Sequence, residues 1–346
     1  MTLNVVFLPG DGVGPEVSDS ARSILEATVA KFNLDLSMQT CAFGGAAIDS
    51  YGDPFPVETQ QACLSADAIF LGAVGGPKWD GAEKRPESGL LALRKTLDVY
   101  ANLRPVQVLS GMENLSPLKP DLARNIDILI VRELTGGLYF GDRTEGDMSA
   151  SDICTYTRAE VQRVARIAFR AARERRGKVV SVDKANVLAT SRLWRSSVID
   201  LHQSEFADVE LEHMLVDAMA MKLIQCPAEY DVLLTENLFG DILSDEASVL
   251  SGSIGMAPSA SLGDGTRGLY EPIHGSAPDI AGTGKANPVG AILSVAMLLR
   301  HSLEVPEAAD IIEVGVQQAI KAGYGTGDIG GQDSTQNFTE KLIALL

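Results

Sequence analysis

The sequence has few cysteines, few aromatic residues and no long apolar run. Its four cysteines show no CxxC spacing and its four histidines form no HExxH motif, which argues against a disulfide framework and a zinc site. The longest strongly apolar run, residues 291–299, is far too short to cross a bilayer, and the N-terminus lacks the basic segment of a secretory signal. We therefore expect a cytoplasmic protein with no membrane partner.

Positive charge is also scarce. The chain has 29 Lys and Arg against 46 Asp and Glu, a net charge of −17, whereas nucleic-acid binding requires a basic surface. We therefore expect no nucleic-acid partner. The exception is a predicted helix over residues 158–176, capped by Thr157 and ended by Gly177, which is rich in arginine. We interpret it as a solvated or interface face on an acidic protein.

Aliphatic residues and glycine are abundant instead, which is typical of an α/β enzyme. Short apolar runs alternate with helical patterns and predict βαβ units with a largely parallel sheet. Residues 134–156 are rich in Gly, Thr and Asp and predict a projecting β-hairpin arm. The predicted buried strands are residues 3–8, 68–73, 126–131, 179–182 and 231–234.

The stretch from Asn237 to Asp245 is the most informative motif. Gly240 is expected to mark the turn from a strand into a helix, on which Asp241 and Asp245 lie one turn apart on the same face. Like charges so placed cost roughly 0.2–0.5 kcal/mol unless a positive group lies between them. With the amide of Asn237, the two carboxylates suit Mg²⁺ or Mn²⁺. The alternative is a solvated acidic face.

Three arginines, a lysine, an acid and a tyrosine extend this pattern. Arg94, Arg104 and Arg132 can each bind a carboxylate or phosphate through two N–H groups, which makes a polyanionic substrate credible. Lys184 follows a predicted strand, where partial burial makes a lysine a base.

Asp217 is a lone acid in an apolar helical run, and such a carboxylate is costly unless it is paired or binds a metal. Tyr139, on the predicted arm, is either a proton donor or a packed aromatic.

Two glycine-rich segments have the composition of ligand-binding loops. Residues 9–16 follow the first strand, but their glycine spacing is G-x-G-x-G, so they match neither the Rossmann fingerprint nor a P-loop. Residues 271–288 are rich in Gly and Pro, which allows the backbone to approach a ligand closely. Asp279 in this loop can accept hydrogen bonds from ribose hydroxyls. The alternative is an ordinary long loop.

Taken together and in this order, these motifs closely resemble the isocitrate/isopropylmalate family of β-decarboxylating dehydrogenases over nearly the whole chain. The resemblance implies that family's non-Rossmann fold, with two α/β domains that share a central mixed sheet and a β-arm that dimerises the protein. It implies a cofactor-binding domain of residues 1–99 and 252–346, and a dimerisation and substrate domain of residues 100–251.

The resemblance also implies roles for single residues. Arg94, Arg104 and Arg132 would bind the malate carboxylates, and Tyr139 would protonate the enol. Lys184 and Asp217 would come from the partner subunit of an obligate homodimer, Lys184 as the base and Asp217 as a metal ligand beside Asp241 and Asp245. The implied residues that bind the adenosine of NAD are His274, Gly275, Ser276, Ala277, Pro278, Asp279, Ile280 and Asn287.

Substrate choice is expected to depend on Leu90, Leu91 and, from the partner subunit, Val187. Isocitrate-type relatives have Asn at the Leu90 position, whereas an apolar wall favours an isopropyl group, whose burial is worth roughly 2–3 kcal/mol. A third carboxylate there would cost several kcal/mol. The implied reaction is oxidative decarboxylation of (2R,3S)-3-isopropylmalate to 4-methyl-2-oxopentanoate in leucine biosynthesis.

Cofactor choice is expected to depend on Asp279 and Ile280, where NADP-using relatives carry Lys and Tyr. A carboxylate that faces a 2′-phosphate repels it, so we expect NAD⁺ rather than NADP⁺. Two alternatives remain at this stage. One is a sibling dehydrogenase for tartrate, D-malate or homoisocitrate, and the other is a catalytically silent regulatory subunit, although the residues that such a subunit loses are present here.

Overall fold

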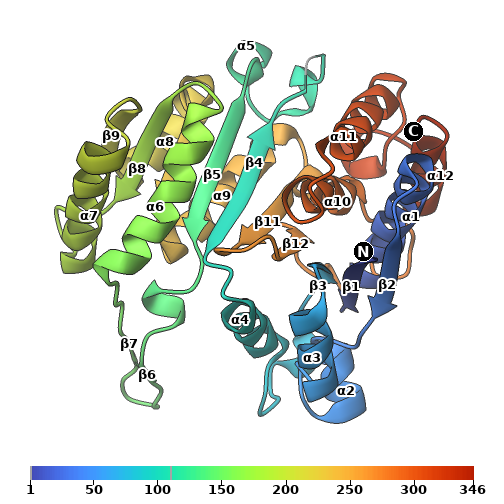
Figure 1. Ribbon diagram of the computed structural model, residues 1–346, viewed down its shortest axis with the longest axis horizontal. Helices are drawn as coiled ribbons and strands as arrows, with labels where there is room; N and C mark the ends of the chain where they lie inside the picture. The colour runs from blue at the N-terminus through green and yellow to red at the C-terminus, as the bar shows by residue number, and fades with distance from the viewer. Residues whose placement is uncertain (1, 110) are drawn as a thin grey trace. The chain divides into compact units, whose positions relative to one another are not determined.

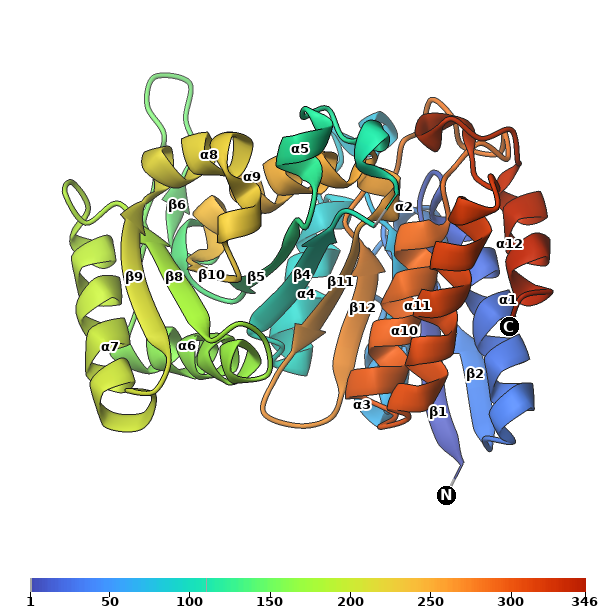
Figure 2. The same ribbon diagram turned by 90° about the horizontal axis from the view of Figure 1, so that it is seen from above.

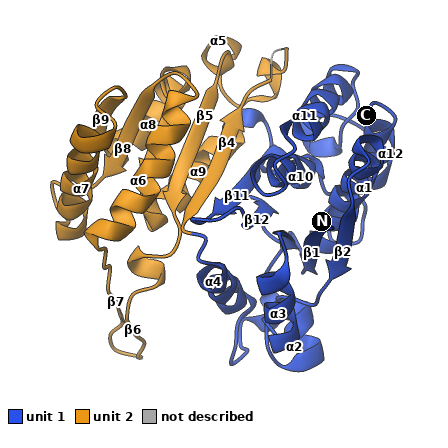
Figure 3. Ribbon diagram, in the orientation of Figure 1, with its two compact units in different colours: residues 1–99, 251–346 blue, residues 100–250 orange. Residues whose placement is uncertain are grey.

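The computed structural model describes residues 2–109 and 111–346, which form two compact units. Unit 1 consists of Met1–Val99 and Ser251–Leu346, and unit 2 of Tyr100–Leu250 (Figure 3). Each unit contains parallel and antiparallel strands with helices on both faces. The predicted α/β class with a mixed sheet is therefore confirmed.

The strands of unit 1 follow the order β2-β1-β3-β12-β11. β1 pairs in parallel with β2 and β3, β12 pairs in parallel with β3, and only the β11–β12 pair among these is antiparallel. The glycine-rich turn after β1 therefore lies at the same edge as the carboxyl end of β3. The strands are β1 (Leu3–Gly10), β2 (Leu36–Thr40), β3 (Ala68–Ala73), β11 (Pro258–Leu262) and β12 (Gly268–Pro272).

Helices cover both faces of these strands. α1 and α10 pack on one face and α3 on the other (Figure 1). α10 contains the apolar run of residues 291–299, which is buried in the core of unit 1. No helix in the described ranges has the length and apolarity required to cross a membrane. The helices are α1 (Gly14–Phe32), α2 (Gly45–Tyr51), α3 (Val57–Ser65), α4 (Pro86–Leu97), α10 (Val289–His301), α11 (Pro306–Lys321) and α12 (Thr335–Ile343).

The strands of unit 2 follow the order β4-β5-β10-β8-β9. β5, β10, β8 and β9 are parallel, and β4 is antiparallel to β5. The carboxyl ends of the parallel strands meet at one edge, which brings together the segments that follow β5, β10 and β8. The strands are β4 (Ala101–Gln107), β5 (Asp127–Glu133), β8 (Lys178–Asp183), β9 (Glu210–Leu215) and β10 (Val232–Thr235).

Helices α6 (Arg158–Arg173) and α7 (Ala189–Glu205) cover one face of these strands, and α8 (Val216–Gln225) and α9 (Asn237–Ser248) cover the other (Figure 2). The core between them is aliphatic, with fully buried side chains such as Ile128, Ile130 and Leu233. A short helix, α5 (Pro120–Ala123), precedes β5.

The arginine-rich helix α6 begins as predicted and ends earlier than predicted. Thr157 and Glu160 form a capping box, but the helix stops at Arg173 rather than Arg176. The reason is the buried carboxylate of Asp231, which accepts bonds of 2.8 Å from the Arg175 side chain and from the Arg176 backbone and so draws the chain out of the helix.

The α6 arginines form ion pairs with acidic residues on the neighbouring segment. Arg166 pairs with Glu205 at 2.8 Å and Arg173 with Asp208 at 2.5 Å. These intramolecular pairs agree with a solvated face rather than a nucleic-acid surface.

The prediction that Gly240 marks the turn into a helix is wrong. α9 begins at Asn237, because the Glu236 carboxylate caps it by accepting the Phe239 N–H at 2.8 Å. Gly240 lies inside the helix, where a Cβ atom would come within 2.2 Å of Thr235 Oγ1 and 2.6 Å of Arg132 Cγ. Glycine at this position lets α9 pack directly against the side chain of Arg132.

The expected hairpin is present. β6 (Arg143–Thr144) and β7 (Ser151–Asp152) pair antiparallel at the end of an exposed loop (Figure 1). Its role in dimerisation remains a prediction.

Candidate active site

The two acidic residues of α9 lie beside two buried guanidinium groups. Arg104 Nη1 donates to Asp245 Oδ1 at 3.2 Å, and its Nη2 lies 3.7 Å from Asp241 Oδ1. Arg132 Nη1 donates to the same Asp241 oxygen at 2.5 Å. The repulsion expected between Asp241 and Asp245 is therefore offset by positive charge. Sequence spacing predicts the acidic pair, and the structure supplies the counter-charges.

Strand register places both arginines on the face that α9 covers. Asn102 on β4 lies opposite Arg132 on β5, and Arg104 lies two residues further along β4 on the same face. Asn102 Oδ1 accepts the Arg104 Nε–H at 2.7 Å, and Asn237 Oδ1 accepts from Arg132 Nη2 at 2.8 Å. These amides fix the planes of the two guanidinium groups.

Tyr139 completes this group. It ends the short 3-10 turn η3 (Gly137–Tyr139), and its hydroxyl donates to Asp241 Oδ2 at 2.8 Å. Burial and the bond to Asp241 raise the pKa of Tyr139 to about 12. The phenol therefore keeps its proton near neutral pH, as a proton donor must.

Lys184 and Asp217 form a separate pair. Lys184 directly follows β8, and Asp217 lies in the first turn of α8. Lys184 Nζ donates to Asp217 Oδ1 at 2.5 Å. The Asp217 side chain is 60% exposed, and Lys184 supplies the positive partner that such an acid requires. The apolar neighbours Met221 and Ile224, on the same face of α8, are themselves exposed. Val187, in the same loop as Lys184, is 63% exposed.

The donor chemistry suits a hard divalent cation. Asp241 and Asp245 offer carboxylate oxygens, which are the ligands that Mg²⁺ and Mn²⁺ prefer. Within residues 2–109 and 111–346 of one chain, no group of three or more His, Cys, Asp or Glu side chains is placed to bind a metal.

In unit 1, helix α4 presents the predicted substrate residues. Leu90 and Leu91 are half-buried, and Arg94 lies one turn further on the same side of the helix. Arg94 is 7% exposed and its Nη2 bonds Glu271 Oε1 at 2.9 Å, whereas its Nε has no partner. An apolar wall and an incompletely satisfied guanidinium therefore share one helix face.

The predicted cofactor loop packs against the turn after β1. Val13 N donates to the Ser276 carbonyl at 2.8 Å. Gly12 has a φ of +59°, and a Cβ there would lie 1.9 Å from the same carbonyl oxygen. The glycine-rich segment that fails the Rossmann pattern is therefore the surface on which this loop rests.

Polar groups of the loop are available to a ligand. His274 Nδ1 lies 2.9 Å from the Gly275 carbonyl, and its buried Nε2 has no partner. Burial lowers the pKa of His274, so the imidazole is neutral. The Asp279 side chain is exposed beside half-buried Ile280. An orphaned imidazole nitrogen and an exposed carboxylate fit the base and the ribose hydroxyls of a nucleoside.

Asn287 is positioned at the end of the loop. Its Nδ2 donates to Asp328 at 2.9 Å, and its Oδ1 accepts from Val289 N at 3.0 Å. The remaining predicted loop residues, Gly275, Ala277 and Pro278, lie between His274 and Asp279 in the same irregular segment.

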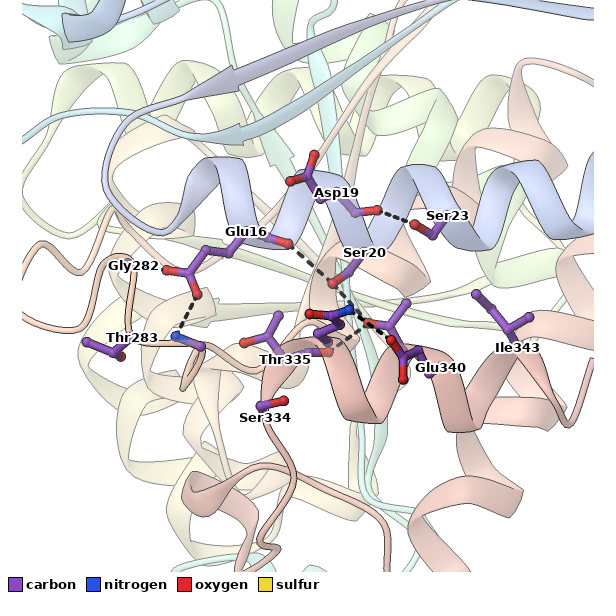
Figure 4. Close-up of a pocket in the computed structure, with 13 residues that line it drawn as sticks. Glu16, Asp19, Ser20, Ser23, Gly282, Thr283, Ser334, Thr335, Glu340 and Ile343 are labelled. Carbon is purple, nitrogen blue, oxygen red and sulfur yellow. Dashed lines mark hydrogen bonds between the residues drawn. The ribbon is translucent and has the colours of Figure 1, made fainter.

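Glu16, at the start of α1, fixes the far side of this loop. Its two carboxylate oxygens accept the N–H groups of Gly282 at 2.5 Å and Gly284 at 3.0 Å. Beside this contact lies a pocket of about 720 Å³ between α1, the glycine turn of residues 282–284 and α12 (Figure 4). Glu16, Asp19 and Glu340 line it, so it does not suit an anionic dinucleotide.

Sequence reasoning missed several residues that position the site. Glu16 stands in the glycine-rich motif but carries no local signal for a bond to a loop far along the chain. The others are Glu133, Tyr156, Glu236, Glu271 and Asp328.

Comparisons with known proteins agree on one family. The family model described as isocitrate/isopropylmalate dehydrogenase matches residues 4–342. The 3-isopropylmalate dehydrogenase of Oleidesulfovibrio alaskensis is 54% identical, with 97% of this chain and 96% of the relative covered. That of Bacillus subtilis is 53% identical, with 100% and 98% covered.

A solved structure is similar over the same extent. The crystal structure of isocitrate dehydrogenase from Methylococcus capsulatus has a TM-score of 0.90 and 34% identity, and the match covers 99% of both chains.

Proposed function

The chain belongs to the isocitrate/isopropylmalate dehydrogenase family, and we propose that it oxidatively decarboxylates 3-isopropylmalate to 4-methyl-2-oxopentanoate in leucine biosynthesis, with NAD⁺ as the oxidant. The observation that carries this choice of substrate is on α4, where Leu90 and Leu91 accompany Arg94 on one helix face. The relatives named 3-isopropylmalate dehydrogenase support the same choice.

The apolar wall discriminates against a third carboxylate. Burial of an isopropyl group against two leucines is worth roughly 2–3 kcal/mol. Of the two cations on α4, Arg94 already bonds Glu271, and Lys95 is exposed to solvent. Leaving the charge of a third carboxylate unpaired costs several kcal/mol. Isocitrate is therefore disfavoured, whereas shorter alkylmalates lose only the ~10–200-fold that one methylene provides.

Arginines bind the carboxylates of the malate. Arg104 and Arg132 are buried and are held in plane by amide oxygens, so they lose little entropy when they bind a carboxylate through two N–H groups. Arg94, on α4 of unit 1, is the third arginine that we assign to the malate carboxylates. Guanidinium groups whose planes are already fixed orient a substrate before the reaction begins.

Asp241 and Asp245, with Asp217 of a second copy, would bind Mg²⁺ or Mn²⁺. When bound, the cation lowers the pKa of the C2 hydroxyl and stabilises the enolate oxygen, while NAD⁺ accepts the hydride from C2.

Proton transfers are assigned to two side chains. Lys184 of a second copy takes the hydroxyl proton as the hydride leaves, which gives a β-keto acid. Loss of CO₂ leaves the bonding electrons in an enolate, and the Tyr139 hydroxyl, whose pKa is raised to about 12, protonates its carbon.

Cofactor preference follows from the exposed Asp279. Its carboxylate accepts hydrogen bonds from the 2′- and 3′-hydroxyls of a ribose but repels a 2′-phosphate. NAD⁺ is therefore favoured over NADP⁺, and comparable kcat/KM values for the two would contradict this assignment.

A homodimer is part of the proposal. On α8, Asp217, Met221 and Ile224 share one face, and on α9 Asp245 shares a face with exposed Ile242. α8 and α9 lie side by side (Figure 2). If these faces of two copies meet, the apolar contact brings Asp217 of one copy toward Asp245 of the other.

The four cysteines are free thiols, which supports a cytoplasmic location.

The test is an assay of NADH formation with isopropylmalate, NAD⁺ and Mg²⁺. We expect turnover that is lost with EDTA and falls sharply with isocitrate or NADP⁺. Turnover of tartrate or D-malate above that of isopropylmalate would favour the sibling enzyme. No turnover of any of these substrates would favour a silent subunit.

A further inference from the structure

We infer that Tyr156 is a positioning residue whose hydroxyl group joins the segment that carries Tyr139 to the start of α9, and so sets the distance between Tyr139 and Asp241. The inference rests on the proposed function, in which Tyr139 donates a proton beside the metal-binding carboxylates.

Tyr156 lies at the root of the arm and is almost fully buried, with its ring edge-on to Trp194 at 5.5 Å. Its hydroxyl oxygen lies 3.2 Å from Glu133 Oε2 and 3.3 Å from Glu236 Oε2, and it accepts the Asn237 N–H at 3.0 Å. Glu133 ends β5, Glu236 caps α9 and Asn237 is its first residue. One oxygen atom therefore joins three segments.

The two carboxylates are an expensive choice for a buried site. A phenol has one proton, so it donates to only one of the two carboxylates at a time. Burial raises the pKa of both Glu133 and Glu236. Two acids in contact with a single phenol are not explained by packing alone, because apolar residues of similar volume avoid the desolvation cost. Their bonds to the backbone give the explanation.

Glu133 and Tyr156 together position the segment before Tyr139. The Glu133 carboxylate accepts the N–H groups of Thr135 and Gly136, each at 2.8 Å. Gly137 has a φ of +72°, and a Cβ there would lie 2.5 Å from the Tyr156 hydroxyl. The backbone therefore rests on the phenol two residues before Tyr139.

Glu236 and Asn237 position α9 against the same segment. Glu236 caps the helix through the Phe239 N–H, and Asn237 Nδ2 donates to the Gly136 carbonyl at 3.1 Å. One turn later Asp241 accepts the Tyr139 hydroxyl at 2.8 Å. The Tyr139–Asp241 contact is thus the last link in a ring of bonds that passes through the Tyr156 hydroxyl.

Tyr156→Phe removes the hydroxyl and keeps the ring. We expect the dissociation constant for Mn²⁺, measured by electron paramagnetic resonance titration of the full-length dimer, to rise roughly tenfold, as for other residues that orient metal ligands. We expect kcat to fall by roughly the same factor, with the KM for NAD⁺ within about twofold of wild type. The split between kcat and the KM for NAD⁺ distinguishes positioning from general destabilisation.

Tyr270→Phe is the matched control. Tyr270 in unit 1 is fully buried, and its hydroxyl lies 2.6 Å from Ser302 Oγ. Its loss removes a comparable hydrogen bond and should lower the melting temperature while Mn²⁺ affinity and kcat stay at wild-type values.

Wild-type Mn²⁺ affinity and kcat in folded Tyr156→Phe would overturn the inference and leave Tyr156 a packing residue. If that variant does not fold, Glu133→Gln puts an N–H donor or a neutral acceptor where the backbone N–H groups and the phenol meet a carboxylate. A shift in Mn²⁺ affinity in the same direction then supports the inference, and no shift overturns it. Failure of wild type to oxidise isopropylmalate would refute the proposed function instead, because Mn²⁺ binding is measured without turnover.

Discussion

Among single residues, the arginines at the acidic pair illustrate how charge is arranged for binding. Arg104 and Arg132 neutralise Asp241 and Asp245 within one chain. The same guanidinium groups are buried, so they interact strongly with any further carboxylate that approaches. The site can therefore hold a cation and an anionic substrate in contact without a large net charge.

Glu16 provides the first prediction at this scale. Glu16→Gln leaves one acceptor oxygen for the Gly282 and Gly284 N–H groups where there are now two. We expect the KM for NAD⁺ to rise about fivefold, the equivalent of about 1 kcal/mol for one hydrogen bond, with kcat nearly unchanged. Initial-rate kinetics with varied NAD⁺ measure this split.

Asp19→Asn is the control for Glu16. Asp19 is exposed and lines the same pocket, and its substitution removes the same charge. The bonds to the N–H groups of Gly282 and Gly284 come from Glu16 instead. An equal rise in KM for both variants would mean that the negative charge of the pocket matters rather than the bonds of Glu16.

His213 gives a prediction on pH. His213 lies on β9, and both of its ring nitrogens are buried without hydrogen-bond partners. Burial is the main cause that lowers the pKa of His213, and the positive charge of Arg195 lowers it further. The unfolded chain binds this proton near pH 6.5 and the folded chain only at lower pH, so stability falls as pH falls below about 6.5. His213→Phe should make that loss of stability smaller, because phenylalanine has no proton to bind in either state.

Urea unfolding at about pH 7.5 and about pH 5.5, at one protein concentration, measures the difference. The same loss of stability in wild type and in His213→Phe would show that His213 does not contribute.

At the scale of helices and strands, much of unit 2 is predictable because its signals are local. The β5 and β10 strands are short aliphatic runs, and the capping box of α6 is a four-residue pattern. The acidic pair follows from helical spacing alone. One error arises where a distant group decides the outcome, as Asp231 does for the end of α6. The other arises from a local cap that spacing does not reveal, the Glu236 carboxylate at the start of α9.

Helix α8 shows why the burial of a residue is harder to predict than the helix that contains it. Its composition is largely apolar, yet Met221 is 57% exposed and the Asp217 side chain 60% exposed on the same face. A sequence does not distinguish a face that packs inside a chain from one that packs against a second copy. The Arg94–Glu271 pair is unpredictable for another reason, since long segments of chain separate the partners.

The exposed face of α8 carries a prediction. Met221→Lys places a charge in the apolar surface that we assign to the dimer, and we expect monomers in sedimentation velocity and loss of activity. Val314→Lys on α11 adds the same charge at a position that is 49% exposed in unit 1, and it should remain dimeric. A dimeric, active Met221→Lys would place the interface elsewhere.

At the scale of the whole molecule, shared active sites predict complementation. Lys184→Ala and Asp245→Asn each disable a different half of the proposed site. Each pure variant should be inactive. After the two are mixed, unfolded and refolded together, half of the dimers are mixed and each has one intact site, so about a quarter of wild-type activity should return.

The assay is NADH formation before and after refolding. No recovery in the mixture, under conditions in which wild type regains its activity, would show that each chain builds its site alone. Activity in either pure variant would remove that residue from the proposed chemistry.

Gly240 has a consequence for how this chain can vary. Every single-nucleotide change that alters a glycine codon to another amino acid introduces a Cβ atom, and here that atom would lie so close to Thr235 and Arg132 that their side chains or the helix must move. No single substitution at Gly240 is therefore expected to be neutral. Substitutions that reshape the apolar wall on α4 can therefore accumulate in this protein, whereas substitutions at the position where α9 packs against Arg132 cannot.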